Sequence, residues 1–186
     1  MSGNFAPKKK STTAPDEKDR WGTTWECFAD ACALYGNRFK WDVCAEAVTS
    51  KCKDEYFGPD SGYWPDALYA GQDWPEDWWC NPPFSQKMKF IQHARAMQEL
   101  GIQGMMLLPY EPASVWWRQL LGEDVIVYEP AGRYNFYEVD GVTKKTGVNF
   151  PSAFILFPAH NLGGQSIRVP FNKGVGKHLL MDGVVP

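Results

Sequence analysis

Short apolar runs alternate with helical patterns along the middle of the chain, between residues 39 and 128. The runs that predict strands lie at 39–44, 78–80, 102–108 and 125–128. The patterns that predict helices lie at 85–100 and 113–121. Because this alternation is how a parallel sheet covered by helices is built, the sequence predicts an α/β fold with a mostly parallel sheet.

The chain changes character after residue 128. Two strand-like runs, 134–137 and 153–157, flank the pair Asp140-Gly141, which is a typical hairpin turn signal. We therefore expect an antiparallel hairpin to close the parallel sheet.

Local signals predict how several of these elements begin and end. Thr24 is the expected N-cap of a helix through Leu34, and Gly36 is its expected stop. Ser85 is the expected N-cap of the helix 85–100. A further helix is expected over 45–53.

The first twenty residues are polar, with Pro interspersed and the basic run Lys8-Lys9-Lys10. They predict a disordered or loosely attached basic arm, residues 1–20. Residues 21–186 then form a single domain of roughly 165 residues, enough for one good core. No internal repeat is found.

Charge and hydropathy limit the class of protein. The formal charge of −3 argues against a protein that coats nucleic acid, but it allows one local basic face. Candidate residues for such a face are Lys8–Lys10, Lys87, Lys89, Arg133, Lys144, Lys145, Lys173 and Lys177. No apolar run is long enough for a membrane span and no secretory signal is found, so we expect a cytoplasmic protein.

The five cysteines are an odd number in a chain without an export signal, which favours reduced thiols. A zinc site at Cys27, Cys32, Cys44 and Cys52 is the alternative. The gaps between these four residues match no common zinc motif, so no metal is expected.

Asn81-Pro82-Pro83-Phe84 is the sharpest signal in the chain. With Pro at about 5% of residues, such a string arises by chance in about one chain in several hundred of this length. It directly follows the expected strand 78–80 and directly precedes the expected helix, which is where an open α/β sheet places its ligands. The string therefore indicates a functional loop.

The residue types of this loop suit the methylation of a planar amino group. Such a nitrogen is a poor nucleophile because its lone pair is delocalised. The Asn81 side-chain carbonyl and the Pro82 backbone carbonyl can accept both amino protons and draw the nitrogen toward tetrahedral geometry. Phe84 offers a face on which a flipped base can stack, and nearby tryptophans, Trp64, Trp74, Trp78 and Trp79, are further candidates for stacking.

An ordered set of segments resembles a family, the phage-type DNA N6-adenine methyltransferases, a compact Dam-like group. The matching segments are 21–24 (WGTT), 39–45 (FKWDVCA), 66–68 (DAL) with 73–74 (DW), 79–85 (WCNPPFS) and 132–136 (GRYNF). The resemblance implies a Rossmann-like methyltransferase fold, S-adenosylmethionine as methyl donor, and the N6 amino group of adenine in double-stranded DNA as acceptor.

Carried over by position, the resemblance implies roles for individual residues. Asn81, Pro82 and Phe84 are the expected catalytic residues. The expected cofactor contacts are Asp42, Ala45, Asp66, Trp21 and Thr24. The expected substrate contacts are Pro83, Ser85, Lys87 and Arg133; Ser85 is alternatively only a helix cap, and Arg133 only a structural ion pair. Two departures stand out: no glycine-rich turn follows Asp42, and Thr23-Thr24 replaces the usual Thr-Pro.

The loop itself does not identify the acceptor. Adenine in RNA and glutamine in proteins also present a planar conjugated amino group, and a binding module with a decayed cofactor site would account for the missing glycine turn. The chain has no room for a large target-recognition domain. Sequence specificity is thus expected from loops 55–75 and 138–150, from the terminal arms, or from a second subunit in a homodimer.

Overall fold

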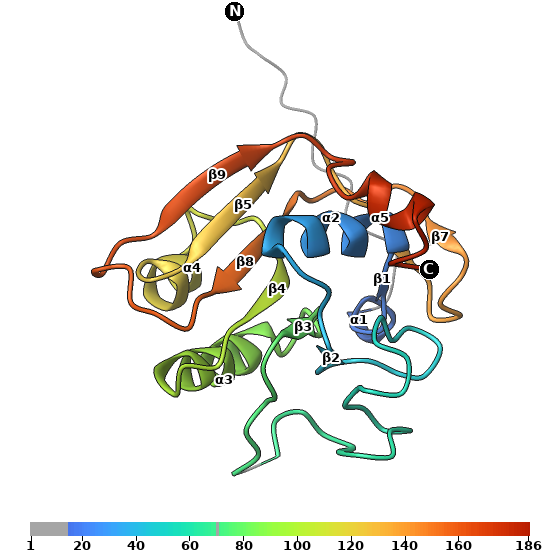
Figure 1. Ribbon diagram of the computed structural model, residues 1–186, viewed down its shortest axis with the longest axis horizontal. Helices are drawn as coiled ribbons and strands as arrows, with labels where there is room; N and C mark the ends of the chain where they lie inside the picture. Colours follow the sequence, from blue (N-terminus) through green and yellow to red (C-terminus); the bar gives the residue numbers. More distant parts are fainter. Residues whose placement is uncertain (1–14, 70) are drawn as a thin grey trace, which may run out of the picture.

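The computed structural model describes residues 15–69 and 71–186, and its centre is a six-stranded sheet (Figure 1). Its strands, in spatial order, are β2 (Trp41–Asp42), β3 (Trp78–Cys80), β4 (Gly104–Pro109), β8 (Ser152–Phe157), β5 (Ile126–Pro130) and β9 (Ile167–Phe171). β2, β3 and β4 are parallel, as are β5 and β9, whereas β8 runs antiparallel to both β4 and β5. Five strands therefore end at the same edge of a mixed sheet.

Helices cover both faces of this sheet. Along β3, Trp78 and Cys80 belong to one hydrophobic cluster and Trp79 belongs to the other, as expected for side chains that alternate between faces. α3 (Lys87–Glu99) and α4 (Val115–Leu121) pack in the first cluster. α2 (Trp25–Tyr35) packs in the second, beside α5 (Lys177–Met181). The predicted α/β class is thus observed, in three layers.

The prediction that the runs 134–137 and 153–157 form a hairpin is wrong. β6 (Phe136–Tyr137) pairs with β7 (Lys144–Lys145) and with β1 (Gly22–Thr23), forming a separate three-stranded sheet. Asp140-Gly141 does lie in the turn between β6 and β7. The run expected to pair with 134–137 is instead β8, which lies between β4 and β5. Five of its six residues are buried, and an apolar strand buried on both faces belongs inside a sheet rather than in a half-exposed hairpin.

Local predictions had mixed outcomes. Thr24 caps α2 by accepting a hydrogen bond from the backbone of Cys27, and Gly36 ends the helix in the left-handed conformation, as predicted. Ser85 does not cap α3, which begins two residues later with Gln86 at the cap position. The strand expected over 39–44 is only two residues long. The helix expected over 45–53 is a series of turns.

The described chain is already folded before Trp21. Residues 15–18 form the short helix α1 (Pro15–Lys18), and Asp19 and Arg20 hydrogen-bond to distant parts of the chain. The rest of the predicted arm, including Lys8–Lys10, lies outside the described residues. Among the described residues no helix combines the length and apolarity that a membrane crossing requires.

Candidate active site

A cavity of about 320 Å³ lies at the edge of the sheet where β2 and β3 end. Four stretches of the chain line it: 19–23, 42–49, 57–67 and 81–90. Six of the residues predicted from the sequence meet there: Trp21, Asp42, Ala45, Asp66, Asn81 and Pro83. The loop after β3 and the turn after β2 are therefore two walls of one site.

The orientation of the Asn81 amide is fixed. Its Nδ2 donates a hydrogen bond to the backbone carbonyl of Trp21, with 2.8 Å between the two heavy atoms. A carbonyl only accepts, so the amino side of the amide must face Trp21 and Oδ1 must be the remaining, accepting atom. Within residues 15–69 and 71–186, neither this oxygen nor the Pro82 carbonyl receives a hydrogen bond. Asn81 lines the cavity, whereas Pro82 is buried and lies outside the lining.

Phe84 is held by other aromatic rings. Its ring lies edge-to-face with Trp21, Phe136 and Phe150, at centroid distances of 6.2, 6.2 and 5.2 Å. The side chain is half-buried and does not line the cavity itself. Three perpendicular neighbours hold the plane of the ring in one orientation.

Asp42 brings a buried carboxylate to the cavity. It is 3% exposed and accepts hydrogen bonds from the backbone N–H groups of Cys44 (3.4 Å) and Lys51 (3.0 Å). Burial raises the pKa of Asp42 to about 7, against the opposing effect of these N–H groups and of the Lys51 ammonium. The carboxylate is therefore poised to change its charge near neutral pH.

A profile of the DNA N-6-adenine-methyltransferase (Dam) family matches residues 10–172, most of the chain. The chain belongs to this family. It is accordingly an adenine-specific DNA methyltransferase. A DNA N-6-adenine-methyltransferase of Haemophilus phage HP1 (strain HP1c1) is 27% identical over 151 residues, which cover 80% of this chain and 83% of the phage protein. No solved structure gives a significant match.

In this Dam-family chain the turn after β2 is closed by local contacts rather than by a glycine of its own. The segment after β2 is closed by the Asp42 carboxylate on Cys44 and by the backbone N–H of Ala45, which donates to the Phe57 carbonyl at 3.0 Å. Gly58 passes so close to this turn that a Cβ added there would lie 1.7 Å from the Ala45 carbonyl oxygen. The close approach therefore requires glycine at position 58, and the sequence analysis did not indicate this contact.

Two residues at the cavity of the Dam-family enzyme carry polar atoms whose role the sequence analysis did not indicate. Trp21 Nε1 and Thr23 Oγ1 are buried polar atoms without a hydrogen-bond partner among the described residues, and both residues line the cavity. Buried polar atoms in proteins are normally paired, so these two are candidates for contact with a ligand. The signal in the sequence was Trp21-Gly22-Thr23-Thr24, but Thr24, which was expected at the cofactor, is the α2 cap and lies outside the cavity.

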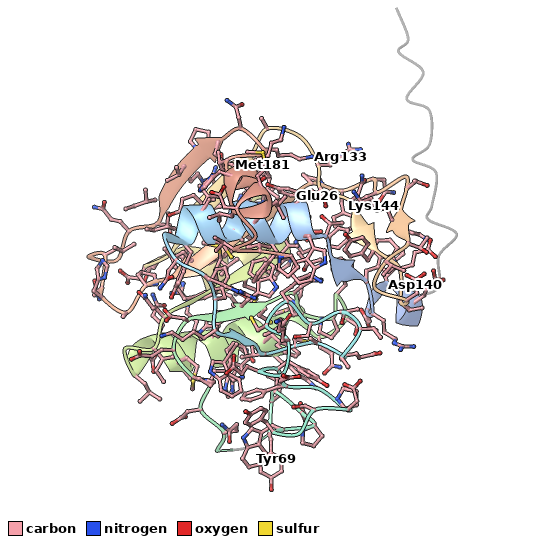
Figure 2. The ribbon with its side chains drawn as sticks, turned by 45° about the vertical axis from the view of Figure 1, so that its right-hand side comes forward. Glu26, Tyr69, Arg133, Asp140, Lys144 and Met181 are labelled. Atoms are coloured by element: carbon pink, nitrogen blue, oxygen red, sulfur yellow. The ribbon has the colours of Figure 1, made fainter. Side chains whose placement is uncertain are left out.

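Three predicted substrate contacts of this methyltransferase lie outside the cavity lining. The Ser85 N–H and hydroxyl both donate hydrogen bonds to the Asp19 carboxylate. The partner of Ser85 is therefore Asp19 and not the N-terminus of α3. Lys87 lies over the Trp116 ring, 5.1 Å from its centroid. Arg133 is exposed at the end of the molecule that carries Lys144, away from Tyr69 (Figure 2).

The tryptophans near the loop are mainly structural in this family member. Trp74, Trp78 and Trp79 are at most 1% exposed and pack in the two core clusters. Trp64 is 38% exposed and stacks on Tyr69. The expected stacking role for the three buried rings is therefore wrong, because no surface of them is accessible to a base.

Proposed function

We propose that this chain transfers a methyl group from S-adenosylmethionine to the N6 amino group of an adenine flipped out of double-stranded DNA. One observation carries the proposal: the Trp21 carbonyl orients the Asn81 amide so that its oxygen is free, in the same cavity as the Asp42 carboxylate. One site thereby combines a hydrogen-bond acceptor for an amine with a carboxylate that can bind a cofactor.

The cavity suits the cofactor in size and in chemistry. Its volume of about 320 Å³ lies in the range of roughly 300–1,000 Å³ that is usual for small-molecule sites. The Asp42 carboxylate can accept hydrogen bonds from the cofactor's amino or ribose hydroxyl groups, and Asp66 can do the same from the facing wall. Trp21 Nε1 and Thr23 Oγ1 offer donors that have no partner among residues 15–69 and 71–186. When bound, the cofactor supplies an electrophilic methyl group.

The chain's own residues prepare the amine. Asn81 Oδ1 and the Pro82 carbonyl each accept a hydrogen bond from one amino N–H, which favours the tetrahedral nitrogen that exists only when the lone pair attacks. As the bond between nitrogen and the methyl carbon forms, the bond between that carbon and sulfur breaks. The methylated nitrogen then releases its extra proton to solvent, so no side-chain base is needed beforehand. Pro83 contributes to the wall behind the loop, and Phe84 stacks on the flipped adenine in the plane that its three ring neighbours impose.

We further assign the chain to the Rossmann-like methyltransferase fold, as one domain. The support is the common direction of β2, β3, β4, β5 and β9, together with a cavity at their carboxyl ends. Because the substrate is DNA, we expect the enzyme to act in the cytoplasm of its cell, where no membrane separates it from the DNA. A homodimer stays a prediction.

A competition between acceptors tests the proposal. Tritiated S-adenosylmethionine is incubated with the protein and equal amounts of duplex DNA, RNA and a glutamine-containing protein mixture. We expect the label in DNA, as N6-methyladenine after digestion to nucleosides. Label found only in RNA or only in protein would show that the acceptor is one of these alternatives and not DNA. Failure of the cofactor to bind in calorimetry would favour a binding module without activity.

A further inference from the structure

A second hollow, about 370 Å³ in volume, lies between α2, α5 and the loop that follows β9. Three lysines line it, each from a different part of the chain: Lys144 on β7, Lys173 after β9 and Lys177 in α5. We call this hollow the lysine groove. All three lysines are exposed, and Arg133 extends the same end of the molecule (Figure 2).

The lysine groove carries more positive than negative charge in a chain whose net charge is −3. Lys144 is paired with Glu26. Within the described part of the chain, Lys173 and Lys177 form no ion pair. The Lys173 ammonium donates one hydrogen bond to the Arg133 backbone carbonyl and lies 4.8 Å from the centroid of the Tyr134 ring. An ammonium has three N–H donors, so Lys173 keeps donors for an anionic partner, as does Lys177.

The groove is built on a buried anchor rather than on loose surface. The Asp30 carboxylate, 2% exposed, accepts hydrogen bonds from the Tyr134 hydroxyl (2.6 Å) and from the backbone N–H groups of Gly174 and Gly176 (2.8 Å each). These bonds hold the loop that carries Lys173 against α2. Asp30 therefore fixes the backbone next to Lys173 and Lys177.

The topology places the lysine groove beside the active-site cavity. β5 and β9 run in the same direction as β3, so the residues after them, including Arg133 and Lys173, emerge at the same edge of the sheet as Asn81. The small sheet β1-β6-β7 joins the two hollows, since Thr23 lines the cavity while the adjacent Thr24 and Lys144 of β7 line the groove. A strand whose base enters the cavity would have its neighbouring phosphates close to this edge.

We propose that the lysine groove binds the phosphate backbone of the DNA duplex next to the flipped adenine, through Lys173 and Lys177. The inference rests on the proposed function, because the base in the cavity fixes where the backbone runs. Lysine ammonium groups neutralise phosphates without reading sequence, so this surface supplies affinity rather than specificity. DNA is favoured over other polyanions by the family to which the chain belongs.

The test compares two double variants with the same change in charge. Lys173→Gln/Lys177→Gln removes two charges from the groove. The control Lys53→Gln/Arg118→Gln removes two charges from exposed residues that line neither the groove nor the cavity. Affinity for a fluorescein-labelled duplex of random sequence is measured by anisotropy between 50 and about 200 mM salt, since phosphate contacts do not depend on sequence. Calorimetry with S-adenosylmethionine checks that each variant is folded.

We expect the groove variant to lose at least about tenfold in duplex affinity at the lower salt, and its slope of log K against log salt to become shallower by about 2. Cofactor binding and the control variant should match the wild type. An unchanged slope, or an equal loss in the control, would refute the groove as the phosphate site while wild-type methylation of DNA still supports the proposed function. If the wild-type protein neither binds nor methylates duplex DNA, or prefers RNA, both proposals fail together.

Discussion

Asn81 donates a hydrogen bond from its side-chain Nδ2 to the backbone carbonyl of Trp21, 60 residues earlier in the chain. This bond joins the loop after β3 to the residue just before β1, and it leaves the amide oxygen of Asn81 without a partner among the described residues. Trp21 in turn packs against Phe84. The loop is thus oriented by a segment that lines the same cavity.

Removing the ring of Phe84 should weaken the capture of the flipped base. We expect Phe84→Leu to raise the KM for DNA by roughly tenfold or more, because stacking of a base on an aromatic ring contributes about 1–3 kcal/mol. Phe84→Tyr keeps the ring and should stay near the wild type. The check is steady-state kinetics together with the fluorescence of 2-aminopurine placed at the target adenine. Equal KM values for all three proteins would exclude a stacking role.

Cofactor affinity should depend on pH through Asp42. The pKa of Asp42 is about 7 in the free protein, raised by burial, and the ionised carboxylate is the better hydrogen-bond acceptor. We therefore expect the Kd for S-adenosylmethionine to rise as pH falls from 8 to 6. Calorimetry across this range measures it, with Asp42→Asn as the variant that should bind weakly and without pH dependence. A wild-type Kd that is flat with pH would contradict this role.

The stability of the free protein should change over a different range. An unfolded Asp has a pKa of about 3.9, whereas burial raises the folded value to about 7. The folded state then holds a proton that the unfolded state has lost, so the free energy of unfolding falls as pH rises from about 4 toward 7 and levels off above it. Asp42→Asn should gain in Tm relative to the wild type between pH 5 and pH 8. A constant difference in Tm would show that Asp42 does not titrate there.

Gly58 should be irreplaceable where it meets Ala45. A Cβ at position 58 would lie 1.7 Å from the Ala45 carbonyl oxygen, so Gly58→Ala must displace the turn that follows Asp42. We expect a Tm several degrees lower and a cofactor affinity reduced by at least about tenfold. Gly62→Ala, in the same loop, meets nothing within 4 Å and is the matched control. Wild-type behaviour of Gly58→Ala would mean that the close approach has no role in the site.

The sequence predicted those features that local patterns encode. The loop at Asn81, the strand before it and the cap at Thr24 were placed correctly, because each depends on neighbours within a few residues. The partner of β8 was not, since an apolar run fits either a hairpin or a central strand until its neighbours are known. Ser85 was assigned to the helix because its true partner, Asp19, is 66 residues away.

The lining of the cavity was predicted less completely for the same reason. Asp42, Ala45 and Asp66 do meet in the cavity. Gly58, however, acts through a close approach of two loops, and no local pattern indicates which glycine will meet which carbonyl. Thr23 and Thr24 are neighbours, yet the Thr24 hydroxyl caps α2 while the Thr23 hydroxyl has no partner among the described residues. Only the course of β1 shows which of the two threonines faces the cavity.

A single-turnover assay of Asn81→Ala tests the central claim most directly. Saturating enzyme with labelled S-adenosylmethionine is mixed with duplex DNA, and N6-methyladenine is quantified by mass spectrometry of the digested nucleosides, with Asn37→Ala, in an exposed turn, as the control. The account predicts that Asn81→Ala lowers the transfer rate by at least about 10²–10³ while its Kd for the cofactor stays within a few-fold of the wild type. An Asn81→Ala enzyme that forms N6-methyladenine at the wild-type rate would contradict it.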